Sequence, residues 1–258
     1  MFEHFRPHRT SSRPESSQEI RLRRNPKHNK ITGKVGKLKI SHISGTLKSD
    51  MYDICTSQNK TAYGILHGNA TIVFIKPGLG GSIYGYKNKY LLIAKKLNER
   101  YGCMVICSEN NGNMDFGNDM TFVKKYAVDH HIPDFKIYFF GHSNGALQGM
   151  CEAFKFAQIK RLLLINTPLM INPHKTIPGI KNFNGEKMYL VFGSEDPSYS
   201  LLQLYSQLES EKVQIDIYRG ADHHFKDALD LFMTLPEKYL FFDTFESNKS
   251  SLPIQPFL

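Results

Sequence analysis

Residues 136–149 read KIYFFGHSNGALQG, and this stretch decides the fold. Its first five residues form a mostly apolar, aromatic-rich run that is typical of a buried strand. Two glycines then flank Ser143 in the pattern Gly-x-Ser-x-Gly, and residues 144–156 carry apolar side chains at helical spacing. A serine on so sharp a turn brings neighbouring backbone very close, so the positions two before and two after it need small residues. The stretch therefore predicts a strand, a tight turn that carries a serine, and a helix.

Strand-like and helix-like segments alternate on both sides of this stretch. Further strands are predicted at residues 71–76, 103–108, 161–165, 187–192 and 213–218, and further helices at 86–101, 118–130, 199–208 and from 225 onward. Such alternation predicts an α/β fold with a mostly parallel central sheet and helices on both faces. Residues 37–44, 51–56 and 61–66 lack intervening helices, which predicts an antiparallel N-terminal edge. The polar segment 166–186 predicts only a minimal lid.

A glycine-rich loop, Pro77-Gly78-Leu79-Gly80-Gly81-Ser82, follows the predicted strand at residues 71–76. Glycines let backbone amides approach and point at a ligand, as stabilisation of an oxyanion requires. A phosphate-binding loop is an alternative interpretation. The chain, however, has neither a Walker lysine ending nor the Gly-x-Gly-x-x-Gly spacing of a dinucleotide fold.

A carboxylate and a pair of histidines follow two later strands. Asp196 lies in Gly193-Ser194-Glu195-Asp196-Pro197, and His223 and His224 lie in Gly220-Ala221-Asp222-His223-His224-Phe225. Loops at the carboxyl ends of parallel strands meet at one edge of the sheet. We therefore expect a serine, a carboxylate and a histidine to meet there, in the chain order Ser, Asp, His.

Four stretches together resemble the α/β-hydrolase family over about residues 60–240: IVFIKPGLGGS, FFGHSNGALQG, LVFGSEDP and GADHHF. The resemblance implies a serine hydrolase that needs neither cofactor nor metal. It gives Ser143 the role of nucleophile, Asp196 that of the orienting carboxylate and His223 that of the base. His223 is preferred because relatives commonly read Gly-x-x-His-x-Phe, although His224 stays open. The resemblance also implies an oxyanion hole made by the backbone N–H groups of Leu79 and Asn144.

Two departures from that family pattern concern the loops around the expected site. Pro77-Gly78 stands where many relatives have His-Gly, so a side chain that often braces the oxyanion loop is missing. The run Ser108-Glu109-Asn110-Asn111-Gly112 stands where many relatives have an Asp-x-Arg-Gly turn. We expect these changes to alter the rigidity of the loops and to leave the three side chains in place. The short lid predicts a shallow, open pocket.

Positive charge is concentrated at the N-terminus. Residues 1–39 hold eleven Lys and Arg against three acids, a net +8, so the other 219 residues carry only +1 of the total +9. The arm is also rich in proline and serine, and it cannot bury enough apolar surface to offset its ordering entropy. We expect a disordered basic arm at 1–35, one α/β-hydrolase domain at 36–245, and a tail at 246–258. The arm's partner is left open between an acidic protein and an anionic lipid surface, and the nearly neutral body argues against nucleic acid.

Composition excludes several classes of protein. A hydrophobic content of 41% in 258 residues excludes a wholly disordered chain, and no apolar run is long enough to suggest a transmembrane segment. Four cysteines without a Cys-x-x-Cys pair suggest reduced thiols and a cytoplasmic protein. The expected substrate is a small-molecule carboxylic ester. Thioester, amide or lactone cleavage and acyl transfer use the same machinery and stay open, as does a non-catalytic scaffold that works through its basic arm.

Overall fold

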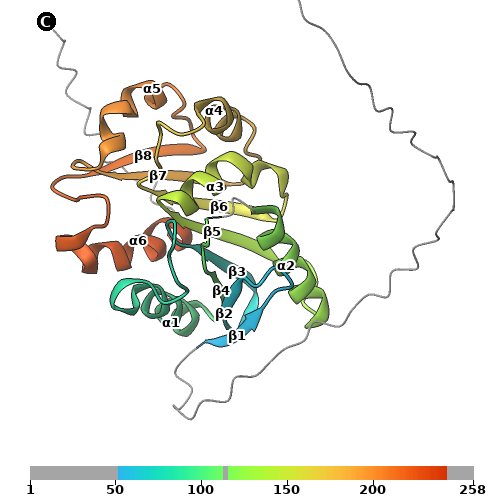
Figure 1. The fold of residues 1–258 in the computed structure, drawn as a ribbon. Helices are drawn as coiled ribbons and strands as arrows, with labels where there is room; N and C mark the ends of the chain where they lie inside the picture. The colour runs from blue at the N-terminus through green and yellow to red at the C-terminus, as the bar shows by residue number, and fades with distance from the viewer. Residues whose placement is uncertain (1–51, 113–115, 243–258) are drawn as a thin grey trace, which may run out of the picture. The chain divides into compact units, whose positions relative to one another are not determined.

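The computed structural model describes residues 52–112 and 116–242, and the structure below is that of these residues. They form an eight-stranded sheet in the order β1-β2-β4-β3-β5-β6-β7-β8, in which β3 to β8 run parallel (Figure 1). The strands are β1 Asp53–Thr56, β2 Ala62–Leu66, β3 Asn69–Lys76, β4 Cys103–Ser108, β5 Lys136–His142, β6 Ile159–Ile165, β7 Lys187–Gly193 and β8 Val213–Tyr218. β1 and β2 pair antiparallel, and β2 pairs antiparallel with β4. The predicted fold class and the antiparallel edge are confirmed.

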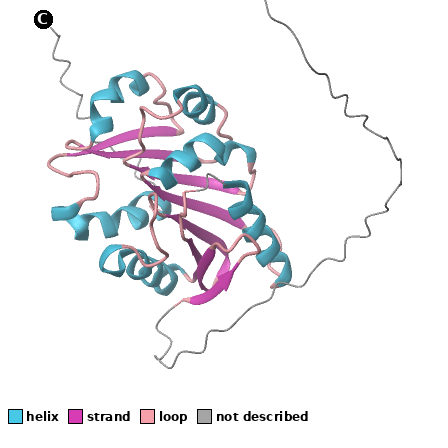
Figure 2. Cartoon of the chain, in the orientation of Figure 1, coloured by secondary structure: helices cyan, strands magenta, loops and turns pink. Residues whose placement is uncertain are grey.

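Helices cover both faces of the sheet (Figure 2). They are α1 Lys89–Tyr101, α2 Phe116–Asp129, α3 Asn144–Glu152, α4 Pro173–Lys181, α5 Leu202–Ser206 and α6 Leu229–Phe241. α1 and α6 pack against one face, and α2 to α5 pack against the other. Alternate residues of each central strand enter the two cores; in β3, for example, Phe74 belongs to one cluster and Ile75 to the other. Burial on both faces explains why these strands read as continuous apolar runs instead of alternating ones.

Three segments differ from their predicted structure. The helix expected from residue 86 begins as α1 at Lys89, because Lys87 and Asn88 have φ angles of 51° and 57°, which no α-helix allows. The helix expected at 199–208 is a 3₁₀ turn at Pro197–Leu201 followed by the short α5. The polar segment 166–186 contains α4, which packs so closely on α3 that a Cβ at Gly179 would lie 1.9 Å from the Met150 carbonyl oxygen.

Some predictions fall on other parts of the chain. The basic arm at 1–35, the strand at 37–44 and the tail at 246–258 lie outside the described residues. Within 52–112 and 116–242, no helix combines the length and the apolar character that a bilayer crossing needs. All four cysteines are described, and each is a buried free thiol.

Candidate active site

Ser143 stands on the turn between β5 and α3. Its φ of 53° and ψ of −120° lie in a region that L-residues rarely adopt. Both flanking glycines are needed because of close backbone contacts. A Cβ at Gly141 would lie 2.7 Å from the Ala146 nitrogen, and one at Gly145 would lie 2.1 Å from the Lys76 carbonyl oxygen. This tight turn places the serine at the carboxyl edge of the sheet, where β5 ends.

Three side chains from three loops form one hydrogen-bonded chain. The Ser143 hydroxyl oxygen lies 2.8 Å from His223 Nε2, and His223 Nδ1 lies 2.5 Å from Asp196 Oδ2. Asp196 is only 4% exposed, and its other oxygen accepts a hydrogen bond from the Ser198 amide at 2.7 Å. An ionised carboxylate can only accept, so Nδ1 carries the proton and Nε2 is free to take one from the serine. The arrangement can deprotonate the hydroxyl as it attacks.

The choice between the two histidines follows from this geometry. Among the described residues the structure brings His223, and not His224, into hydrogen-bond range of Ser143. The His224 ring is exposed and lies edge-on to that of His223, with centroids 5.0 Å apart. Its backbone amide donates to Asp222 Oδ1, which fixes the turn that carries both histidines.

Two buried side chains hold the backbone of His223, and sequence reasoning missed both roles. His142 Nε2 donates to the His223 carbonyl oxygen at 3.0 Å, and Asn166 Nδ2 donates to the same oxygen at 2.9 Å. Because Nε2 of His142 must be the donor, its Nδ1 accepts from the Tyr90 hydroxyl at 3.3 Å. Burial, with the Lys89 ammonium nearby, lowers the pKa of His142 to about 3, so the ring is neutral at pH 7.

The glycine-rich loop passes directly over the serine. A Cβ at Gly78 would lie 3.2 Å from Ser143 Cβ and 3.6 Å from its hydroxyl oxygen. The next residue, Leu79, has a side chain that is 69% exposed. The amides of Gly80 and Gly81 are already bonded, to the Asn110 and Gly78 carbonyl oxygens. Leu79 and Asn144, the predicted oxyanion donors, thus lie on the two segments that adjoin Ser143.

Buried amide side chains lie behind this loop and the turn, and sequence reasoning missed them as well. Asn110 and Gln148 are both fully buried, and both donate to Asn144 Oδ1, at 3.0 and 2.8 Å. The i, i+4 spacing of Asn144 and Gln148 on α3 was the available local signal. Asn110 gave none beyond its place in the unusual turn after β4, because its partners are distant in sequence.

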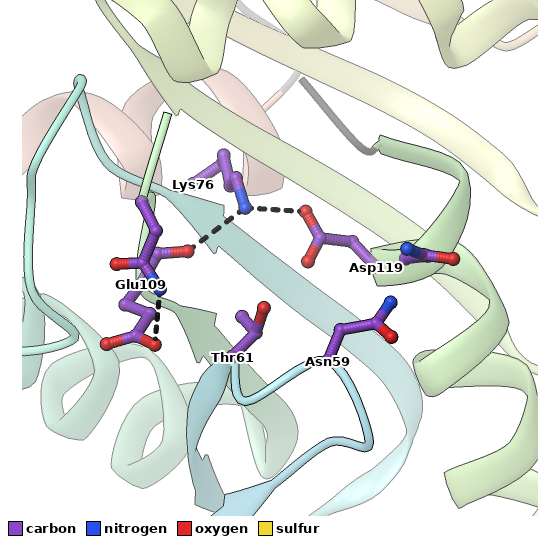
Figure 3. A pocket seen from close by; sticks show the side chains of 7 residues that line it. Asn59, Thr61, Lys76, Glu109 and Asp119 are labelled. Atoms are coloured by element: carbon purple, nitrogen blue, oxygen red, sulfur yellow. Dashed lines mark hydrogen bonds and ion pairs between the residues drawn. The ribbon is translucent and has the colours of Figure 1, made fainter. Parts of the chain in front are cut away.

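A polar cavity of about 120 Å³ lies between α2 and the ends of β3 and β4 (Figure 3). It is lined by Asn59, Thr61, Lys76, Glu109, Asn111, Asn118 and Asp119. The buried Lys76 ammonium lies 2.7 Å from Asp119 Oδ2 and donates to the Glu109 carbonyl oxygen at 3.1 Å. Lys76 and Glu109 immediately precede Pro77 and Asn110. The Lys76 ammonium thus ties the end of β3 both to α2 and to the segment after β4.

Within the described residues, His142, His223 and His224 form a group whose nitrogen atoms lie within 4.8 Å of one another. Such a group could in principle hold a metal ion. The nitrogens of His142 and His223, however, are already engaged in the hydrogen bonds described above. Only His224 keeps its ring nitrogens free of them, so the donor set fits a hydrogen-bonded site better than a metal centre.

Comparison with solved structures identifies the fold. No protein-family model matches the chain. No curated protein sequence matches it either. Est1E from Butyrivibrio proteoclasticus superposes with a TM-score of 0.56 at 15% identity, covering 70% of this chain and 93% of its own. A dienelactone hydrolase from Anabaena variabilis superposes with a TM-score of 0.55 at 16% identity, covering 70% of this chain and 89% of its own. An α/β serine hydrolase homologue from Coxiella burnetii superposes with a TM-score of 0.56 at 17% identity, covering 75% of this chain and 98% of its own. The chain has the α/β-hydrolase fold.

Proposed function

We propose that this protein is a serine hydrolase that cleaves an acyl bond, with a carboxylic ester as the substrate that fits best. The observation that carries the proposal is the unbroken hydrogen-bonded chain from Ser143 through His223 to the buried Asp196. A neutral serine hydroxyl is a weak nucleophile, and a base oriented by a carboxylate is what activates it. The similarity to solved hydrolases of this fold adds support.

In this mechanism the Ser143 oxygen attacks the acyl carbonyl carbon while its proton passes to His223 Nε2. Asp196 stabilises the resulting imidazolium and does not itself take the proton. The backbone N–H groups of Leu79 and Asn144 stabilise the oxyanion. The imidazolium then protonates the leaving alcohol. Water deprotonated by the same imidazole releases the acyl group and restores the serine.

Replacement of Ser143 by alanine tests the proposal. We expect turnover of p-nitrophenyl esters to fall by roughly a million-fold, because removal of a nucleophile disables the whole triad. A fluorophosphonate probe should label the wild-type protein and leave the variant unlabelled. Unchanged hydrolysis in the variant would contradict the assignment. A folded wild-type protein whose serine stays unlabelled would instead support a non-catalytic scaffold.

A cytoplasmic location belongs to this proposal. It is supported by the four free thiols, each buried away from solvent. Burial raises the pKa of Cys103 to about 12 and that of Cys151 to about 11, which keeps both in the unreactive thiol form. Cell fractionation with an antibody to the protein would test the location.

A further inference from the structure

Asn110 lies where the glycine-rich loop meets the turn at Ser143. It follows β4 by two residues, and its side chain is fully buried. A buried amide costs free energy unless its donors and acceptor are used, so its hydrogen bonds indicate what the position requires. They lead to both halves of the proposed oxyanion hole.

Three of these bonds clamp the glycine-rich loop on both sides of Leu79. Asn110 Nδ2 donates to the Pro77 carbonyl oxygen at 2.8 Å. The Gly80 amide donates to the Asn110 carbonyl oxygen at 2.7 Å, and the Asn110 amide donates to the Gly81 carbonyl oxygen at 2.9 Å. The backbone before and after Leu79 is therefore fixed by a single residue.

A fourth hydrogen bond connects Asn110 to Asn144, the other residue of the proposed oxyanion hole. Asn110 Nδ2 also donates to Asn144 Oδ1 at 3.0 Å, which ties the loop to the first residue of α3. Gln148 Nε2 supports the pair, since it donates to Asn144 Oδ1 at 2.8 Å and lies 3.3 Å from Asn110 Oδ1. One side chain thus bridges Pro77, two residues before Leu79, and Asn144.

We propose that Asn110 is the positioning residue of the oxyanion hole, and that it holds the Leu79 and Asn144 amides at the separation the tetrahedral intermediate needs. This role rests on the proposed serine hydrolase function. Asn110 acts where the loop has Pro77 and no bracing histidine. Three glycines lie between residues 78 and 81, and glycine loses more conformational entropy on ordering than any other residue. Such a loop needs an external brace to preorganise its amide.

The bonds also explain why the side chain must be an amide. Nδ2 donates to two oxygens, while Oδ1 accepts from the Gly112 amide at 3.3 Å. Aspartate has the same shape but no donor when ionised, so it would set a carboxylate oxygen against the Pro77 carbonyl and Asn144 Oδ1. The substitution therefore removes the two side-chain bonds to Pro77 and Asn144, keeps the two backbone bonds of residue 110, and preserves the volume.

The test compares Asn110→Asp with Asn184→Asp. Asn184 is an exposed residue of the loop before β7, so its variant gains the same charge away from the glycine-rich loop. Loss of one oxyanion donor costs roughly 100- to 1,000-fold in kcat, and displacement of a donor should cost less. We expect Asn110→Asp to lower kcat about 10- to 100-fold with KM changed less than about threefold. Affinity for phenylboronic acid, which forms a tetrahedral adduct with the serine, should fall in parallel. Asn184→Asp should stay within about twofold of wild type.

Asn110→Ser guards against a charge effect or a failure to fold. Serine is neutral but too short to reach both acceptors, so a folded variant should show the same loss of kcat and of boronate affinity. Circular dichroism and urea unfolding establish which variants are folded. Unchanged kcat and boronate affinity in a folded Asn110 variant would overturn the role of Asn110 alone. A wild-type protein that neither hydrolyses esters nor reacts with a fluorophosphonate would overturn the proposed function, and this role with it.

Discussion

His142 occupies the variable position of Gly-x-Ser-x-Gly, where sequence reasoning assigned no role. Its ring lies behind the site and supports the carbonyl of the residue proposed as the base. In the neutral imidazole, Nε2 donates to this carbonyl while Nδ1 accepts from the Tyr90 hydroxyl, so these two partners fix the tautomer. Burial keeps the ring in this neutral form, because it lowers the pKa of His142. Burial thus couples the folded state to the neutral form of His142.

This coupling predicts a pH dependence of stability. In the unfolded chain His142 titrates near pH 6.5, and in the folded protein its pKa is about 3. Between these values the unfolded state binds the extra proton, so the free energy of unfolding falls as pH falls, by up to about 1.4 kcal/mol per pH unit. His142→Gln does not titrate and can still donate to the His223 carbonyl. We expect urea unfolding at pH 7, 6, 5 and 4 to show a shallower loss in this variant. Parallel curves for the two proteins would contradict the prediction.

At the scale of elements, the start of α3 is wedged against the end of β3. Gly145 lies in the first turn of the helix, where helix propensity alone favours alanine by up to about 1 kcal/mol. The packing opposes this preference, since a Cβ there would lie 2.1 Å from the Lys76 carbonyl oxygen and 2.5 Å from that of Pro77. Both obstacles are backbone atoms, which cannot rotate away as a side chain can.

We therefore expect Gly145→Ala to destabilise the protein by about 3 kcal/mol or more, because overpacking against backbone exceeds the gain in propensity. The matched control is Gly117→Ala in α2, at an exposed position, which should leave stability unchanged or raise it by up to about 1 kcal/mol. Urea unfolding followed by circular dichroism measures both. Equal midpoints for the two variants would show that α3 can shift without cost.

The elements that could be predicted from sequence are those whose burial shows in the pattern of their own consecutive residues. β3, β4 and β6 read as continuous apolar runs because both of their faces are covered, and the proximity of Ser143, Asp196 and His223 follows from loops that share one sheet edge. The start of α1 could not be predicted, since it depends on positive φ angles at Lys87 and Asn88, residue types with no strong turn signature together.

At the scale of the whole molecule, the hydrogen bonds that bring the site's loops together join residues that are distant along the chain. Ser143 and His223 are 80 residues apart, and Asn110 meets Pro77 across 33 residues. Neither pair leaves a periodic or local trace, so the supporting contacts of Asn110, Asn166 and His142 form only when the sheet orders the loops. The groups named in the proposed mechanism all lie within residues 52–112 and 116–242.

The location of these groups outside residues 1–35 predicts the effect of removing those residues. The first 39 residues carry a net +8 while the remainder carries +1, so attraction to an anionic surface should reside in the arm. We expect the truncated protein to keep kcat/KM for a soluble ester within about twofold of the full chain, since no group of the proposed site is lost.

Sedimentation with vesicles containing phosphatidylserine should pull down the full chain at low salt and much less at 0.5 M NaCl, because ionic screening weakens surface electrostatics. The truncated protein should not bind at either salt concentration. Retained vesicle binding after truncation would place the anionic contact on the nearly neutral body, and a large loss of kcat/KM would show that the arm contributes to the site itself.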